Sequence, residues 1–124
     1  MRLRVLIVED EFFIATDLQD QVEELGCRVT GTAHNLESCK RVARAERPDI
    51  ALMDLRLARG SSGIDASQWL RDELGVRCIF ISGNLDGATR ERLSAVEPIA
   101  FIGKPIIPHQ LRRALVTYCK ALAG

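Results

Sequence analysis

Short apolar runs of strand length alternate with amphipathic helical patterns along the whole of this 124-residue chain. The apolar runs predict five strands, at residues 4–8, 28–33, 50–53, 76–81 and 100–102. The helical patterns, with the expected N-caps Asn35 and Asp86 included, predict helices at residues 11–25, 35–45, 64–74, 86–96 and from 108 onward. Such alternation is typical of a parallel sheet with helices on both faces. We therefore expect one α/β domain over residues 1–124, folded as a three-layer, doubly wound sandwich.

The predicted helices differ in the strength of their apolar faces. The helix from residue 108 presents four apolar residues on one face: Leu111, Leu115, Tyr118 and Leu122. The pattern at 86–96 has only Leu93 and Val96 as clear apolar anchors, which predicts low local stability. Residues 59–63 are rich in glycine and serine and predict a flexible loop directly above the end of the third strand.

Composition and charge narrow the class of protein. The formal net charge is +0, so nothing in the total charge favours nucleic acid or an anionic membrane as a partner. The apolar runs are far too short to cross a bilayer, and the N-terminus shows no cleavable signal pattern. The four cysteines, at 27, 39, 78 and 119, have no CxxC spacing. This spacing favours reduced, packing cysteines in a cytoplasmic protein over disulfides or a zinc site.

Polar residues follow four of the predicted strands at the point where each strand ends. Asp54 ends one buried strand, and the pair Glu9 and Asp10 ends another. Ser82 and Lys104 end the last two strands of the chain. The carboxyl ends of parallel strands line one shared crevice, where ligands bind in open α/β sheets. Three acids, a hydroxyl and a lysine in one crevice suit a divalent metal ion and phosphoryl chemistry.

Four motifs at these strand ends resemble the receiver domain of bacterial two-component response regulators. They are Val-Glu-Asp-Glu at 8–11, Met-Asp-Leu at 53–55, Ile-Ser-Gly at 81–83 and Phe-Ile-Gly-Lys-Pro at 101–105. The match spans essentially the whole chain in the right order and spacing. The stretch from Phe80 to Gly83 is also similar to a Phe-Ala-Thr-Gly motif in a subgroup of alphaproteobacterial receivers. The resemblance implies a flavodoxin-like sheet of order 2-1-3-4-5 with five helices.

The resemblance also implies roles for individual residues. Asp54 would be the nucleophile that accepts a phosphoryl group from a partner's phosphohistidine. Lys104 would pair with a phosphoryl oxygen, and the following Pro105 suggests the cis peptide bond that the family has there. Ser82 would hydrogen-bond another phosphoryl oxygen. Ser82 and Phe101 together would form the conformational switch, with the aromatic ring turning inward when the serine moves toward the phosphate.

The implied cofactor is Mg²⁺, which prefers oxygen ligands and takes few carboxylates from a protein. By resemblance, Asp10, Asp54 and the backbone carbonyl of Arg56 would be direct ligands, with Glu9 acting through a water. Without metal the three clustered carboxylates repel one another, so at least one pKa should be raised.

Arg56 and Asn84 occupy the two positions whose side chains, in the family, set how long the phosphoryl group survives before hydrolysis. A long cationic side chain at 56 leads us to expect slow self-hydrolysis.

The leading hypothesis is a stand-alone, single-domain response regulator that catalyses only its own phosphorylation and dephosphorylation. Its donor would be a histidine kinase or a phosphotransfer protein. Two outputs fit the sequence equally: phosphorylation-controlled binding of a downstream protein, or onward transfer of the phosphoryl group. A homodimer through the fourth helix, fifth strand and fifth helix is a further expectation from the family. Phe12 and Phe13 fall outside the apolar stripe of the first helix, and either pack on a neighbouring loop or contact a partner.

The alternative hypothesis is a small Mg²⁺-dependent phosphohydrolase on a similar α/β sheet. Such enzymes often carry a second carboxylate two residues after the nucleophile as a general acid. Here that position is Arg56, which counts against hydrolase chemistry. A pseudo-receiver that is not phosphorylated is a third hypothesis, disfavoured because each expected motif residue is present.

Overall fold

Five parallel strands form a single sheet in the order β2-β1-β3-β4-β5, as predicted. The computed structural model describes residues 2–57 and 62–123. The strands are β1 (Arg4–Val8), β2 (Arg28–Ala33), β3 (Ile50–Asp54), β4 (Arg77–Ser82) and β5 (Ala100–Gly103). The helices are α1 (Phe12–Glu24), α2 (Leu36–Ala45), α3 (Gly63–Leu74), α4 (Gly87–Arg92) and α5 (Pro108–Ala123).

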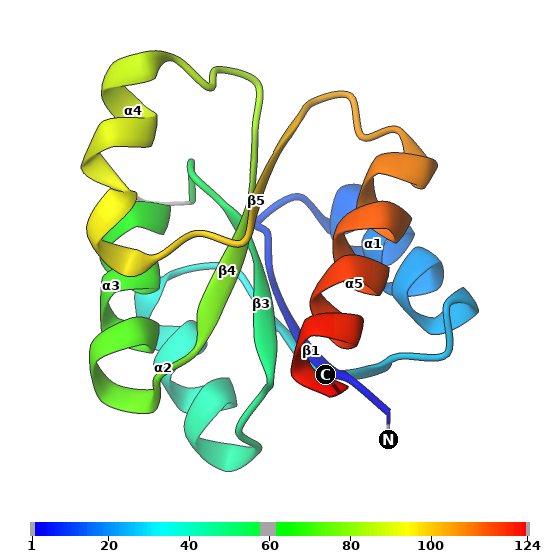
Figure 1. Cartoon of the computed structure of the whole chain (residues 1–124). Helices are drawn as coiled ribbons and strands as arrows, with labels where there is room; N and C mark the ends of the chain where they lie inside the picture. The colour runs from blue at the N-terminus through cyan, green and yellow to red at the C-terminus, as the bar shows by residue number, and fades with distance from the viewer. Residues whose placement is uncertain (1, 58–61, 124) are drawn as a thin grey trace.

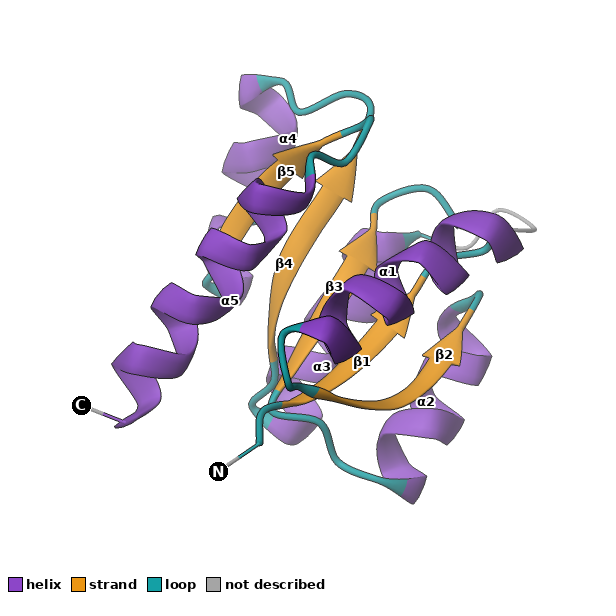
Figure 2. Cartoon of the chain, turned by 90° about the vertical axis from the view of Figure 1, so that its right-hand side faces the viewer, coloured by secondary structure: helices purple, strands orange, loops and turns teal. Residues whose placement is uncertain are grey.

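The helices cover both faces of the sheet and so complete the three layers (Figure 1). α2, α3 and α4 lie on one face, and α1 and α5 lie on the other. Figure 2 shows all five strands pointing the same way, so their carboxyl ends meet at one edge of the molecule. Parallel connections of this kind give this fold one functional edge. Among the described residues, no helix is both long enough and apolar enough to cross a membrane.

Two apolar cores lie on either side of the sheet, one under each helical layer. The three central strands are buried on both faces, which is why they read as continuous apolar runs rather than alternating ones. Met53 and Phe80 belong to the core beneath α2, α3 and α4. Ile7 and Leu52 belong to the core beneath α1 and α5. This rigid centre fixes the strand ends from which the polar side chains project.

The predicted helix signals are confirmed where they depend on local chemistry. Asn35 accepts the backbone N–H of Ser38 at 2.7 Å, and the Ser38 side chain bonds back to the cap in a reciprocal capping box. Asp86 likewise accepts the N–H of Thr89 at 2.7 Å at the start of α4. Gly75 ends α3 with a φ of 67°, a left-handed conformation that suits glycine.

Three sequence expectations need correction. The fourth helix ends at Arg92 instead of residue 96, because the chain tightens into a 3-10 turn (Ser94–Val96) that buries Leu93 and Val96. Leu122 is 47% exposed, so the apolar face of α5 is covered only as far as Tyr118. Gly63, expected in a flexible loop, is the first residue of α3 and is buried. The rest of that expected loop, residues 59–61, lies outside the described residues, and Ser62 caps α3 by accepting the Ile64 N–H.

Candidate functional site

The carboxyl edge of the sheet brings the predicted polar residues together. One carboxylate oxygen from each of Glu9, Asp10 and Asp54 lies within 4.8 Å of the other two. Glu9, Asp54 and Ser82 are buried, whereas Asp10 is exposed. Buried carboxylates this close together need a compensating positive charge or a proton.

Lys104 supplies part of that charge from the end of β5. Its Nζ atom donates to Asp54 Oδ2 at 3.3 Å and lies 3.2 Å from Glu9 Oε1. Its backbone N–H donates to the Ser82 carbonyl at 3.0 Å, which ties it to the end of β4. Partial burial opposes the charged form, but the Asp54 and Glu9 carboxylates together raise the pKa of Lys104. The expected cis peptide bond to Pro105 is present.

Glu9 carries the strongest electrostatic perturbation in the site. Burial, together with the adjacent Asp54 carboxylate, raises the pKa of Glu9 from its ordinary value of 4.5 to about 7. The backbone N–H of Glu11, donated to Glu9 Oε2 at 3.2 Å, and the Lys104 charge only partly offset this effect. The direction matches the rise expected for the acid cluster and falls on Glu9, but burial contributes more to it than the neighbouring Asp54 carboxylate does.

Asp54 is held by contacts to both its side chain and its backbone. Its Oδ1 atom accepts the backbone N–H of Arg56 at 3.1 Å, and its Oδ2 atom accepts from Lys104. A Cβ placed on Gly63 would meet the Asp54 carbonyl oxygen at 2.1 Å, so only glycine fits there. Sequence reasoning missed this role of Gly63, because the residues around it do not indicate how closely α3 approaches β3.

A cavity of about 320 Å³ opens above Asp54. Its lining combines the expected nucleophile, both expected tuning positions, the hydroxyl and the lysine: Asp54, Arg56, Ser82, Gly83, Asn84 and Lys104. The Ser82 hydroxyl is engaged locally, since Oγ accepts the Asn84 N–H at 3.1 Å and donates to the Asn84 carbonyl at 3.3 Å. The cavity is therefore polar, open to a small anion and bordered by two cationic side chains.

Phe101 lies on the far side of β5 from α5. Its ring stacks on Phe80, with ring centroids 5.7 Å apart and an interplanar angle of 22°. The Arg90 guanidinium of α4 lies over the same ring, 4.7 Å from its centroid. Phe101 is half-buried in this position. Arg90 carries no sequence motif, and only the position of α4 reveals its contact.

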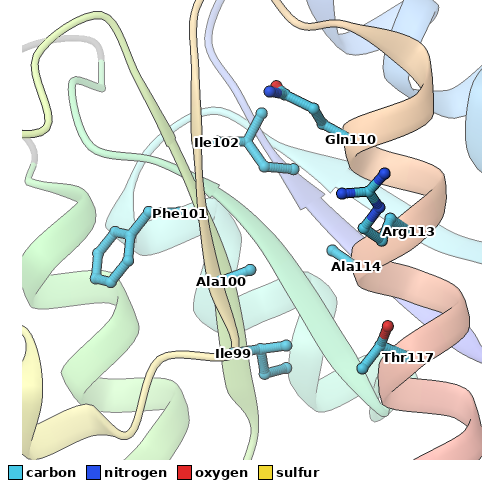
Figure 3. A pocket seen from close by; sticks show the side chains of 8 residues that line it. All are labelled: Ile99, Ala100, Phe101, Ile102, Gln110, Arg113, Ala114 and Thr117. Atoms are coloured by element: carbon cyan, nitrogen blue, oxygen red, sulfur yellow. The ribbon is translucent and has the colours of Figure 1, made fainter.

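Two surfaces beside the site are open to partners. Phe12 and Phe13, at the start of α1, are 75% and 84% exposed, so packing against a neighbouring loop is excluded for both. Phe13 also borders a groove with Lys104 and Pro105. A second hollow of about 330 Å³ lies between β5 and α5 (Figure 3), where Ile99, Ala100 and Ile102 face the helix.

Comparison with known proteins places this arrangement in a family. A sequence model of the response regulator receiver domain matches residues 5–116. The chain belongs to the response regulator receiver domain family. The predicted family and fold are thereby confirmed, and receiver domains act in two-component signalling. A phosphohydrolase on the same sheet is not favoured.

Individual relatives agree with this assignment. The receiver is 41% identical over 110 residues to the phyllosphere-induced regulator PhyR of Methylorubrum extorquens, covering 87% of this chain and 40% of that protein. It is 32% identical over 105 residues to the polar-differentiation response regulator DivK of Brucella anthropi, covering 82% of this chain and 84% of DivK. The signal receiver domain of a modulated diguanylate cyclase from Desulfovibrio desulfuricans G20 superimposes with a TM-score of 0.87 at 33% identity, over 100% of both chains. The likeness to PhyR is thus confined to less than half of that protein.

Proposed function

We propose that residues 1–124 act as a receiver that accepts a phosphoryl group on Asp54 from the phosphohistidine of a histidine kinase or phosphotransfer protein. The observation that carries the proposal is the environment of Asp54. It is buried at the end of β3, bonded to Lys104 Nζ at 3.3 Å and adjacent to Glu9 and Asp10. A carboxylate in this setting is oriented as a nucleophile by its neighbours and faces a cavity large enough for a phosphoryl group.

The proposed transfer makes one bond and breaks one. A carboxylate oxygen of Asp54 attacks phosphorus, an acyl phosphate forms, and the phosphorus–nitrogen bond to the donor histidine breaks, leaving the electron pair on the imidazole. Lys104, already at the carboxylate, would remain to neutralise a phosphoryl oxygen. The Ser82 hydroxyl, which also lines the cavity, would exchange its bonds to Asn84 for one to the phosphoryl group.

The residues present fit a Mg²⁺ site. Glu9, Asp10 and Asp54 offer a set of hard oxygen ligands with net negative charge, which is the donor chemistry that Mg²⁺ takes. Asp10 and Asp54, with the Arg56 backbone carbonyl, would be direct ligands, and Glu9 would act through a water. When bound, Mg²⁺ would neutralise charge on the phosphoryl oxygens. Loss of the Glu9 proton would accompany metal binding at neutral pH.

The proposed output is a change of protein contacts and not turnover of a substrate. Ser82 and Phe101 are the proposed switch residues. α4, β5 and α5 are the proposed surface for a downstream protein or a second copy of the chain, supported by the hollow between β5 and α5 (Figure 3). The exposed Phe12 and Phe13 beside Lys104 support a contact with the phosphoryl donor at the start of α1.

A cytoplasmic location belongs to the same proposal and is supported by the free thiols of the four cysteines.

Intact mass after incubation with acetyl phosphate and Mg²⁺ tests the phosphoacceptor assignment. We expect one added phosphoryl group in the wild-type chain, labile to hydroxylamine as an acyl phosphate is. The group should be absent in Asp54→Asn and retained in Asp20→Asn, a matched change at an exposed aspartate of α1. Phosphorylation of Asp54→Asn at the wild-type level would contradict the proposal.

A pull-down in the presence of beryllofluoride, a phosphoryl mimic, distinguishes the two possible outputs. Enrichment of a non-kinase protein supports partner binding, and enrichment of phosphotransfer proteins alone supports onward transfer.

A further inference from the structure

Arg90, in α4, contacts two other parts of the proposed switch. They are the ring of Phe101 in β5 and the loop between β4 and α4. The Arg90 guanidinium carbon lies 4.7 Å from the centroid of the Phe101 ring, a cation–π distance. Its Nε atom donates to the backbone carbonyl of Leu85 at 3.3 Å, in the loop between β4 and α4. Within the described part of the chain, the Arg90 side chain has no acidic partner within ion-pair distance. The ring and the carbonyl are therefore the contacts that account for its position.

The same conformation keeps the Ser82 hydroxyl engaged in its own loop. Ser82 Oγ bonds to both the N–H and the carbonyl of Asn84, one residue before the carbonyl that Arg90 holds. Drawing this hydroxyl toward a group on Asp54 breaks the two bonds to Asn84 and displaces the loop. Because Leu85 follows Asn84 directly in this loop, such a displacement would strain the hydrogen bond from Arg90 to the Leu85 carbonyl. Arg90 thus contacts both the ring and the loop that holds the serine hydroxyl.

The Phe101 ring lies on the side of β5 opposite α5 (Figure 3). Figure 3 shows Phe101 pointing away from α5, to the side of the sheet that carries α3 and α4, while Ala100 and Ile102 point toward α5. In this position the ring contacts two neighbours, with the Phe80 ring centroid at 5.7 Å and the Arg90 guanidinium carbon at 4.7 Å. A rotation of the ring out of this position would give up the guanidinium contact, because Arg90 belongs to α4.

We propose that Arg90 is a positioning residue that stabilises the unphosphorylated conformation by clamping Phe101 and the Leu85 carbonyl together. This inference rests on the proposed function, since it concerns how strongly Asp54 modification is coupled to Phe101. The clamp acts on a conformational equilibrium. The apparent affinity for a phosphoryl group or its mimic equals the intrinsic affinity multiplied by the fraction of molecules in the competent conformation. Removing a contact made only in the unphosphorylated conformation raises that fraction.

The size of the effect follows from the two interactions that Arg90 makes. At an exposed site a cation–π contact corresponds to a factor of about two to five in an equilibrium constant. Removal of the hydrogen bond to Leu85 adds to it, so we expect Arg90→Gln to bind beryllofluoride about threefold to tenfold more tightly than wild type. Arg90→Lys keeps the charge but not the planar group, and should fall between the two.

Calorimetric titration of beryllofluoride into the Mg²⁺-saturated protein measures this affinity directly. The matched control is Arg92→Gln, the same charge change two residues along α4, at an exposed side chain for which the described structure shows no bond or aromatic contact. Arg92→Gln should bind beryllofluoride within about twofold of wild type, since it removes neither interaction of the clamp. As a second readout, ¹H–¹⁵N NMR shifts of residues 83–86 and 101–103, recorded without beryllofluoride, should move toward the bound spectrum in Arg90→Gln only.

The outcomes separate the inference from the function beneath it. If wild type binds beryllofluoride but Arg90→Gln binds no tighter, or binds tighter only to the same extent as Arg92→Gln, the clamp is wrong and the phosphoacceptor assignment stands. Weaker binding by Arg90→Gln would mean that the arginine favours the phosphorylated conformation, which also overturns the clamp. If wild type binds no beryllofluoride and gains no mass from acetyl phosphate, both the proposed function and the proposed role of Arg90 are contradicted.

Discussion

Gly63, the first residue of α3, lies directly against the backbone of Asp54. A Cβ at position 63 would come within 2.1 Å of the Asp54 carbonyl oxygen and 2.7 Å of Leu55 Cα. Both contacts are with backbone, which cannot swing aside as a flexible side chain can. The position of α3 and the position of the proposed phosphoacceptor are therefore coupled through a single glycine.

We expect Gly63→Ala to lower the free energy of unfolding by about 1–3 kcal/mol, because α3 or the end of β3 must move to admit the methyl group. Urea unfolding measures the loss. Gly87→Ala is the matched control, since a Cβ there meets nothing within 4 Å and alanine favours the helical backbone of α4. Equal unfolding free energies for Gly63→Ala and wild type would contradict the close packing described here.

Glu9 should make the metal-free protein less stable as the pH rises toward neutrality. Its pKa is about 7 in the folded chain against 4.5 ordinarily, so between these values the folded state holds a proton that the unfolded state has released. The stabilisation is complete below pH 4.5 and is lost as the pH rises through 7. Glu9→Gln cannot lose a proton, so its stability relative to wild type should increase over this window by on the order of 2 kcal/mol. Urea unfolding in EDTA at pH 5 and pH 8 checks this, and parallel pH curves for the two proteins would count against it.

Lys104 should compete with Mg²⁺ for the acid cluster. Its Nζ atom lies 3.3 Å from Asp54 and 3.2 Å from Glu9, where it supplies positive charge that a metal ion would otherwise supply. We expect Lys104→Met to bind Mg²⁺ several-fold more tightly than wild type and to be phosphorylated more slowly by acetyl phosphate. Calorimetric Mg²⁺ titration and intact mass give the two readings. Lys120→Met, a change at an exposed lysine in the last turn of α5, should alter neither; weaker Mg²⁺ binding by Lys104→Met would refute the competition.

Arg56 should prolong the life of the phosphoryl group. Its side chain is exposed and borders the cavity above Asp54, where we expect it to hinder an attacking water. Excluding water from a reactive intermediate slows its hydrolysis, so Arg56→Ala should lose the phosphoryl group several-fold faster than wild type. Intact mass followed over time after removal of acetyl phosphate gives both decay rates. Indistinguishable rates would show that the arginine does not shield the acyl phosphate.

The alternation of strands and helices and the polar strand ends could be predicted from the amino-acid sequence, because each depends on periodicity or on motif residues a few positions apart. The caps at Asn35 and Asp86 were predictable for the same reason, since a capping side chain bonds within three residues of itself. The sheet order could be predicted only through the resemblance to receiver domains. Expected boundaries were wrong where tertiary packing overrode local pattern, as at the end of α4. There, burial of Leu93 and Val96 tightens the chain into a 3-10 turn.

Sequence alone determined which residue types gather at the carboxyl edge of the sheet, because parallel strands deliver their ends to one place whatever the helices do. Tertiary structure decided how those residues meet. The approach of Gly63 to Asp54 and the contact of Arg90 with Phe101 join helices to strands across distances that no local pattern encodes. They depend on how each helix is rotated and seated on the sheet, which is set by the packing of the whole core.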